Sequence, residues 1–90
     1  MSKYVLVSAD FSGVDSAQRT KIYECLKEKQ WKKIEDAGRD ISTVWYAPFK
    51  DEATDAGVIS TSKNDFMNCA KPYTTPKLVI HVGPNKPSVY

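Results

Sequence analysis

Three segments of the chain combine β-branched, aromatic and other apolar residues in short runs, a pattern typical of β-strands. They span residues 4–10, 41–49 and 77–83. The first two are the strongest, and their near-continuous apolar character favours central strands that are covered on at least one face. Pro48 ends the second segment or places that end on a sheet edge. We therefore expect a sheet with the first two segments at its centre.

A helix is predicted between the first two of these strands. Asp15 is suited to cap a helix N-terminus, and Gln18 three residues later completes a capping box. Ile22, Tyr23 and Leu26 then recur at helical spacing and share one face. We expect this face to pack against the sheet, with charged residues covering the rest of the helix.

Two further stretches allow more than one interpretation. Residues 31–36 either extend the first helix or form a separate strand that a tight turn joins to the strand at 41–49. Residues 51–71 predict a second helical region in two pieces, because Gly57 and the β-branched residues after it disfavour one long helix. Ser62 or Asn64 would cap the second piece, and residues 57–62 alternatively form a short edge strand.

With residues 31–36 taken as a strand, the order of elements is βαββαβ, which predicts an α+β ferredoxin-like sandwich. Such a fold has a four-stranded antiparallel sheet with two helices on one face. The two strongest strands then occupy the central positions, and this agreement favours the strand over the helix at 31–36. We expect one domain over residues 1–84 and a C-terminal tail at 85–90. The uncovered sheet face favours a homodimer.

Composition and charge exclude several classes. A chain of 90 residues with a net charge of +2 is too evenly balanced to indicate a nucleic-acid binder by charge alone. No apolar run reaches membrane-spanning length, and the N-terminus lacks a secretory signal, so we expect a cytoplasmic protein with no membrane partner. Cys25 and Cys69 are then expected to be reduced and to pack as small hydrophobic residues, with one disulfide as the alternative. The four glycines are scattered, which excludes a phosphate-binding glycine loop.

The pattern of elements resembles a group of small prokaryotic proteins. The relevant segments are residues 4–10 (Tyr-Val-Leu-Val-Ser-Ala-Asp), 42–45 (Ser-Thr-Val-Trp) and 78–82 (Leu-Val-Ile-His-Val). In this order they are similar to the small CRISPR-associated Cas-two nuclease subunit and its relatives, among them the GhoS-type antitoxin ribonuclease. The resemblance covers about residues 3 to 83, and its most specific part is the aspartate that ends the first strand.

This resemblance implies a homodimer in which two Asp10 carboxylates face each other and hold a divalent metal. Carboxylate ligands suit Mg²⁺, which would activate water or stabilise charge on a scissile phosphate. It also implies that the first helix and nearby loops contact a nucleic-acid backbone, with Arg19, Lys32, Lys33 and Arg39 as the candidates. Without the resemblance, Asp10 is also suited to cap the turn after its strand.

Other conspicuous residues have structural explanations. Tyr4, Trp31, Trp45 and Tyr46 would form a stacking platform for bases or, alternatively, pack in the core or in a dimer interface. His81 is suited to general base catalysis, but no catalytic partner lies at a motif-like spacing from it. The lysines between positions 27 and 33 form a solvated face or a phosphate-binding patch.

Three functions follow from these residues. The first is a small macromolecule-binding domain associated with RNA or DNA, in the manner of a Cas-two-like or antitoxin-like protein. The second is a Mg²⁺-dependent endoribonuclease that uses Asp10. The third is an inhibitor or accessory module that binds a protein partner without catalysis.

Overall fold

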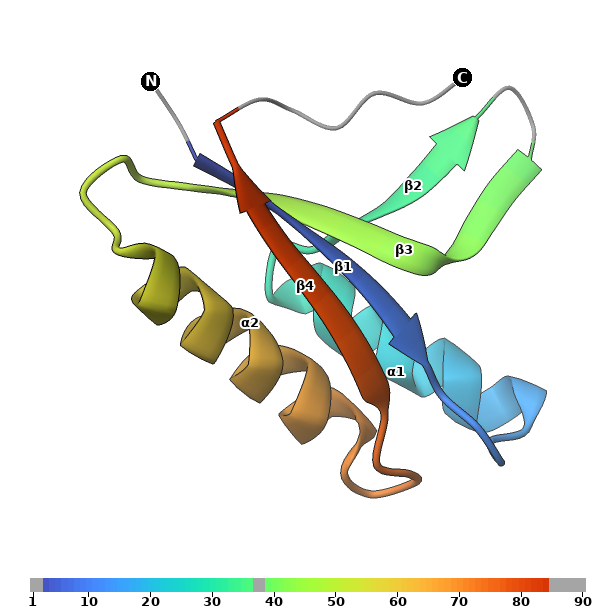
Figure 1. The fold of residues 1–90 in the computed structure, drawn as a ribbon. Helices are drawn as coiled ribbons and strands as arrows, with labels where there is room; N and C mark the ends of the chain where they lie inside the picture. Colours follow the sequence, from blue (N-terminus) through green and yellow to red (C-terminus); the bar gives the residue numbers. More distant parts are fainter. Residues whose placement is uncertain (1–2, 37–38, 85–90) are drawn as a thin grey trace.

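The computed structural model describes residues 3–36 and 39–84, and for residues 35, 36 and 39–43 it describes the backbone alone (Figure 1). The predicted tail at 85–90 and the first half, 37–38, of the predicted turn at 37–40 lie outside the described residues, and the second half of that turn belongs to a strand. Within the described part the elements follow the order βαββαβ. They are β1 (Lys3–Asp10), α1 (Ser16–Glu28), β2 (Lys32–Asp36), β3 (Arg39–Phe49), α2 (Asp55–Ala70) and β4 (Lys77–Gly83).

The four strands form one sheet in the order β2-β3-β1-β4, and each neighbouring pair is antiparallel. Both helices lie on the same face of this sheet (Figure 1). The predicted ferredoxin-like α+β sandwich is therefore confirmed, as is the strand that was one of two alternatives for residues 31–36. The strongest strand segments, now β1 and β3, are central as expected.

Side chains alternate along the central strands because successive residues of a strand point to opposite faces. On β1, Val5 and Val7 are fully buried beneath the helices, whereas Tyr4 and Leu6 on the other face are half-buried. The core is completed by apolar residues from both helices and from the other strands. Its largest buried side chains come from several elements: Trp45, Phe66, Ile22, Leu26, Val5, Val7 and Val58.

Helix α1 begins as the sequence predicts. The Asp15 side chain accepts a hydrogen bond from the Gln18 backbone N–H at 2.8 Å, and the Asp15 N–H donates to the Gln18 side chain at 3.1 Å. This reciprocal pair satisfies two backbone donors that a helix start otherwise leaves without partners. Ile22 and Leu26 are fully buried, so the helix packs on the sheet with the predicted face.

The expectation of a broken second helix is wrong, because α2 is continuous from Asp55 to Ala70. Thr54 caps its N-terminus and accepts a hydrogen bond from the Gly57 N–H at 3.0 Å. Gly57 thus lies in the first turn, where the capping bond offsets the cost that glycine carries in a helix interior. Val58 and Ser62 face the core and are fully buried, and the Ser62 hydroxyl donates to the Val58 carbonyl at 2.7 Å. Packing against the sheet overrides the low helix propensity of these residues.

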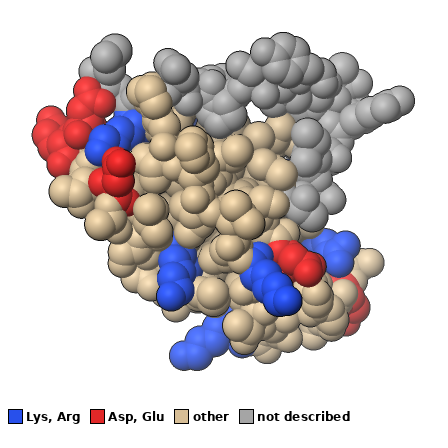
Figure 2. Space-filling view, viewed as in Figure 1, with Lys and Arg blue, Asp and Glu red and all other residues tan. Residues whose placement is uncertain are grey.

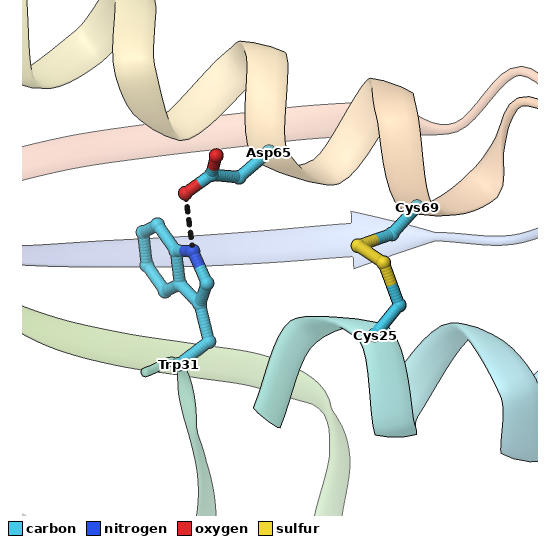
Figure 3. The surroundings of a disulfide bond; sticks show 4 residues. All are labelled: Cys25, Trp31, Asp65 and Cys69. Atoms are coloured by element: carbon cyan, nitrogen blue, oxygen red, sulfur yellow. Dashed lines mark hydrogen bonds between the residues drawn. A yellow bond between two sulfur atoms is a disulfide. The ribbon is translucent and has the colours of Figure 1, made fainter. Parts of the chain in front are cut away.

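The two cysteines form a disulfide, so the expectation of reduced thiols is also wrong (Figure 3). Cys25 on α1 and Cys69 on α2 are 44 residues apart in the chain, yet their Cα atoms lie 5.6 Å apart. The helices bring them together because α1 and α2 pack beside each other on one face of the sheet. Disulfides are typical of oxidising compartments, so this bond does not support the cytoplasmic location, which stays a prediction.

Neither helix in the described ranges is long and apolar enough to cross a membrane.

Candidate functional site

Asp10 ends β1 and is exposed to solvent. Its carboxylate accepts a hydrogen bond from the Ser12 hydroxyl at 3.0 Å. Lys77 on β4 is its cross-strand partner. These neighbours fit the interpretation in which Asp10 shapes the turn after its strand.

A magnesium site at Asp10 would need ligands beyond this one chain. Among the side chains that the structure describes, no group of three or more His, Cys, Asp or Glu residues is arranged to hold a metal ion. The single carboxylate with a lysine opposite it is a poor match for Mg²⁺, which is usually bound through carboxylates and water. The metal and catalytic roles of Asp10 therefore depend on a second copy of the chain, and they stay predictions.

The sheet face opposite the helices carries the half-buried residues Tyr4, Leu6 and Tyr46 and the exposed His81. Leu6 on β1 lies between Tyr46 on β3 and His81 on β4. Val79, two residues before His81, is 71% exposed. Trp31 and Trp45 do not belong to this face, because they are only 3% and 2% exposed and pack in the core. The predicted four-residue stacking platform therefore does not form, and core packing is confirmed for the two tryptophans.

The turn that follows α1 brings β2 back beside the helix. The Trp31 N–H donates to the Leu26 carbonyl, and the Gln30 N–H donates to the Lys27 carbonyl, both at 3.0 Å. This pair of bonds is a Schellman motif, which reverses the chain direction at a helix C-terminus. Gln30 occupies the position that needs a left-handed backbone, with φ of 73°. The chain consequently turns back along α1, and β2 begins directly after Trp31.

We expect Gln30→Gly to raise the free energy of unfolding by about 1 kcal/mol, because glycine adopts positive φ without the steric cost that other residues carry. Urea denaturation followed by circular dichroism measures the difference. Lys29→Gly is the matched control, since Lys29 has φ of −86° and gains nothing from glycine. A Gln30→Gly protein no more stable than the parent would contradict this account of the turn.

A hollow of about 440 Å³ lies between α1 and β2. We call it the α1–β2 hollow. Its volume is within the range of about 300–1,000 Å³ that is usual for small-molecule sites. Its lining combines aromatic rings, ammonium groups, one carboxylate and two hydroxyl groups, from residues Thr20, Tyr23, Glu24, Lys27, Trp31, Lys32, Lys33 and Trp45.

The charge of the hollow is positive, since Lys27, Lys32 and Lys33 outnumber the single acid Glu24. The Lys33 ammonium lies over the Tyr23 ring, 5.1 Å from its centroid, in a cation–π arrangement. A register shift interrupts the β2–β3 pairing between Lys33 and Glu35. Such bulges redirect side chains at the edge of a sheet, and β2 is an edge strand.

The four predicted nucleic-acid contacts are only partly brought together. Lys32 and Lys33 line the hollow, and Arg19 is exposed on α1 one helical turn before Tyr23 without lining it. Arg39 begins β3 and pairs with Asp36, and its side chain lies outside the described part of the chain.

The sequence indicated part of the remaining lining, because Lys27 belongs to the lysines predicted as a solvated face or a phosphate-binding patch and the two tryptophans to the predicted stacking platform. It did not indicate Thr20, Tyr23 or Glu24 as site residues. Tyr23 and Lys27 are four residues apart on α1, a spacing that places both on one flank of a helix. From the sequence, this spacing alone indicates that the two side chains lie close together. Their proximity to Lys33 depends on the turn at Gln30 and is visible only in the fold.

Comparisons of the chain with protein-family models, with curated proteins and with solved structures found no match. The resemblance to the Cas-two subunit and the GhoS-type ribonuclease therefore stays a prediction. The geometry of the described residues is the basis for the functional conclusion.

Proposed function

We propose that this chain binds nucleic acid, and that the phosphate backbone lies along the α1–β2 hollow. The supporting observation is the convergence of Lys27, Lys32 and Lys33, from two different elements, on one concave site. Lysine ammonium groups neutralise phosphates and release condensed counterions, which is the main source of affinity in such complexes. Arg19 lies close enough along α1 to extend the same contact.

The rest of the described surface supports the choice of this site. Acidic side chains gather at the end of the molecule that carries the β3–α2 connection (Figure 2). Asp51, Glu52 and Asp55 are exposed there, and Lys3 forms an ion pair with Asp55 at 2.8 Å. A polyanion would be repelled at that end. On the face drawn in Figure 2, charges of both signs are otherwise interspersed.

We expect the double variant Lys32→Gln/Lys33→Gln to bind nucleic acid about tenfold more weakly near 0.1 M salt. The slope of log affinity against log salt concentration should also fall by about two, or one for each lost phosphate contact. Fluorescence anisotropy of a labelled oligonucleotide, measured over a series of salt concentrations, gives both values. Lys21→Gln is the matched control, because Lys21 is exposed on α1 and does not line the hollow.

Two outcomes would contradict the proposal. The first is no salt-dependent binding of either RNA or DNA by the parent protein, and this would direct attention to a protein partner. The second is binding that the double variant and the Lys21→Gln control reduce equally. Addition of Mg²⁺ in a parallel series tests the nuclease alternative, since cleavage that Asp10→Asn abolishes would establish it.

A further inference from the structure

We infer that the α1–β2 hollow accepts one unstacked base of a single strand, with the adjoining phosphate held by the lysines at its rim. This inference rests on the proposed function and specifies its ligand. Phosphate binding by itself needs only cations. The hollow also presents aromatic, hydroxyl and carboxylate groups, from Tyr23, Thr20 and Glu24.

Tyr23 is the aromatic side chain in the hollow that a ligand reaches. It is half-buried, whereas Trp31 and Trp45 are 3% and 2% exposed and form the wall behind it. The Lys33 ammonium lies over this ring at present. A base that stacked on Tyr23 would take over that contact, and Lys27 and Lys32 in the same lining would bind the phosphate of that nucleotide.

The aromatic wall is held rigidly before any ligand arrives. Tyr23 packs edge-on against Trp45, with ring centroids 5.4 Å apart, and Trp45 packs in the same way against Phe66 at 5.5 Å. Phe66 in turn contacts Trp31 at 4.8 Å. The Trp31 indole N–H donates to the Asp65 carboxylate at 3.0 Å, which fixes its orientation (Figure 3). Rings that are already packed in this arrangement favour stacking of a planar ligand, because less ordering is needed on binding.

The polar groups of the lining distinguish a base from a simple anion. The Glu24 carboxylate and the Thr20 hydroxyl accept hydrogen bonds, and the exocyclic amino group of cytosine is a donor that carboxylates bind. An inorganic anion would contact the lysines alone, because it has no planar face to stack on Tyr23. A base paired within a duplex uses that amino group in pairing and has both faces stacked, so only a single strand supplies the required ligand.

The test compares a labelled ten-nucleotide deoxycytidine strand with a mixed-sequence duplex, both read by anisotropy. Tyr23→Leu should weaken binding of the single strand about tenfold and leave binding of the duplex unchanged, because a stacked base loses its platform while the phosphate contacts remain. Tyr23→Phe keeps the ring and should stay within about twofold of the parent. Lys21→Gln is again the control.

Intrinsic fluorescence provides a second test that does not need a variant. Trp31 and Trp45 both line the hollow. Deoxycytidine monophosphate should therefore quench tryptophan fluorescence in the unaltered protein, whereas inorganic phosphate at the same concentration should not.

Two results would overturn the inference. If the single strand binds the parent and Tyr23→Leu with equal affinity, or if both strand and duplex lose affinity equally, the base does not occupy the hollow although the proposed function stands. If neither strand nor duplex binds the parent protein, the proposed function and the inference fall together.

Discussion

Replacement of Phe66 by alanine is expected to lower the free energy of unfolding by about 3–5 kcal/mol, the usual cost of truncating a buried aromatic side chain. Phe66 on α2 is fully buried and contacts the rings of both tryptophans. A domain of ordinary stability has about 5–15 kcal/mol in total, so this one substitution brings the protein close to unfolding. Urea denaturation followed by far-ultraviolet circular dichroism measures the loss.

Two controls separate this effect from a general sensitivity of α2. Ile59→Ala removes a large apolar side chain from the same helix, but Ile59 is 42% exposed, and the expected change is within about 0.5 kcal/mol. Phe66→Leu retains most of the volume and should cost less than Phe66→Ala. If Phe66→Ala and Ile59→Ala have the same midpoint, the cluster of aromatic rings does not stabilise the core.

Loss of the Cys25–Cys69 disulfide is expected to lower the free energy of unfolding by about 4 kcal/mol. The bond joins residues 44 apart. For a closed loop of that length, the entropy model of cross-linked unfolded chains gives about this value. The measurement compares urea denaturation of the oxidised protein with and without dithiothreitol.

The double variant Cys25→Ala/Cys69→Ala is the control for the reductant. Its stability should match that of the reduced parent and should not respond to dithiothreitol. Alanine is preferred to serine here because Cys69 is only 4% exposed, and a buried hydroxyl would add a separate cost. Equal midpoints for the oxidised and reduced parent would show that the bond adds nothing to the stability of the packed helices.

The fold could be predicted because local patterns and global topology agree. The segment that became β2 was ambiguous by itself, since the position of Ile34 suits a helix or a strand. The requirement that the two strongest strands lie at the sheet centre resolved it. The capping box at Asp15 was equally accessible, because it depends on residues only three apart.

Features that depend on distant residues could not be predicted from the pattern. Gly57 indicates a helix break when it is taken alone. The burial of Val58 and Ser62 against the sheet explains the continuous α2, whereas the bond that the Gly57 N–H donates to the Thr54 side chain is local and could have been predicted. The cysteines are 44 residues apart and carry no sequence motif, so their pairing emerges from the packing of α1 beside α2.

The candidate site was predicted only in part, because it depends on the way β2 folds back beside α1. Lys32 and Lys33 were identified as phosphate contacts from the resemblance. Tyr23 was assigned to the helix face that packs on the sheet, and Lys27 to a set of lysines that forms a solvated face or a phosphate-binding patch. Nothing in the local sequence indicates that β2 folds back beside them. The left-handed residue Gln30 determines that reversal, and a glutamine gives little indication of it.

The disulfide also gives the molecule an uneven response to mechanical force. The bond closes residues 25–69 into a covalent loop that holds β2, β3 and most of α2, and leaves β1 and β4 outside it. These two strands are antiparallel neighbours, and Tyr4 near the start of β1 pairs with Gly83 at the end of β4. Tension applied at these two residues would therefore open the β1–β4 ladder one hydrogen bond at a time. The two cysteines are 44 residues apart, so the loop would withhold roughly 150 Å of extension at about 3.3–3.6 Å per residue. The segment that forms the edge strand β2, with its lysines, would stay within a closed ring after the sheet has parted.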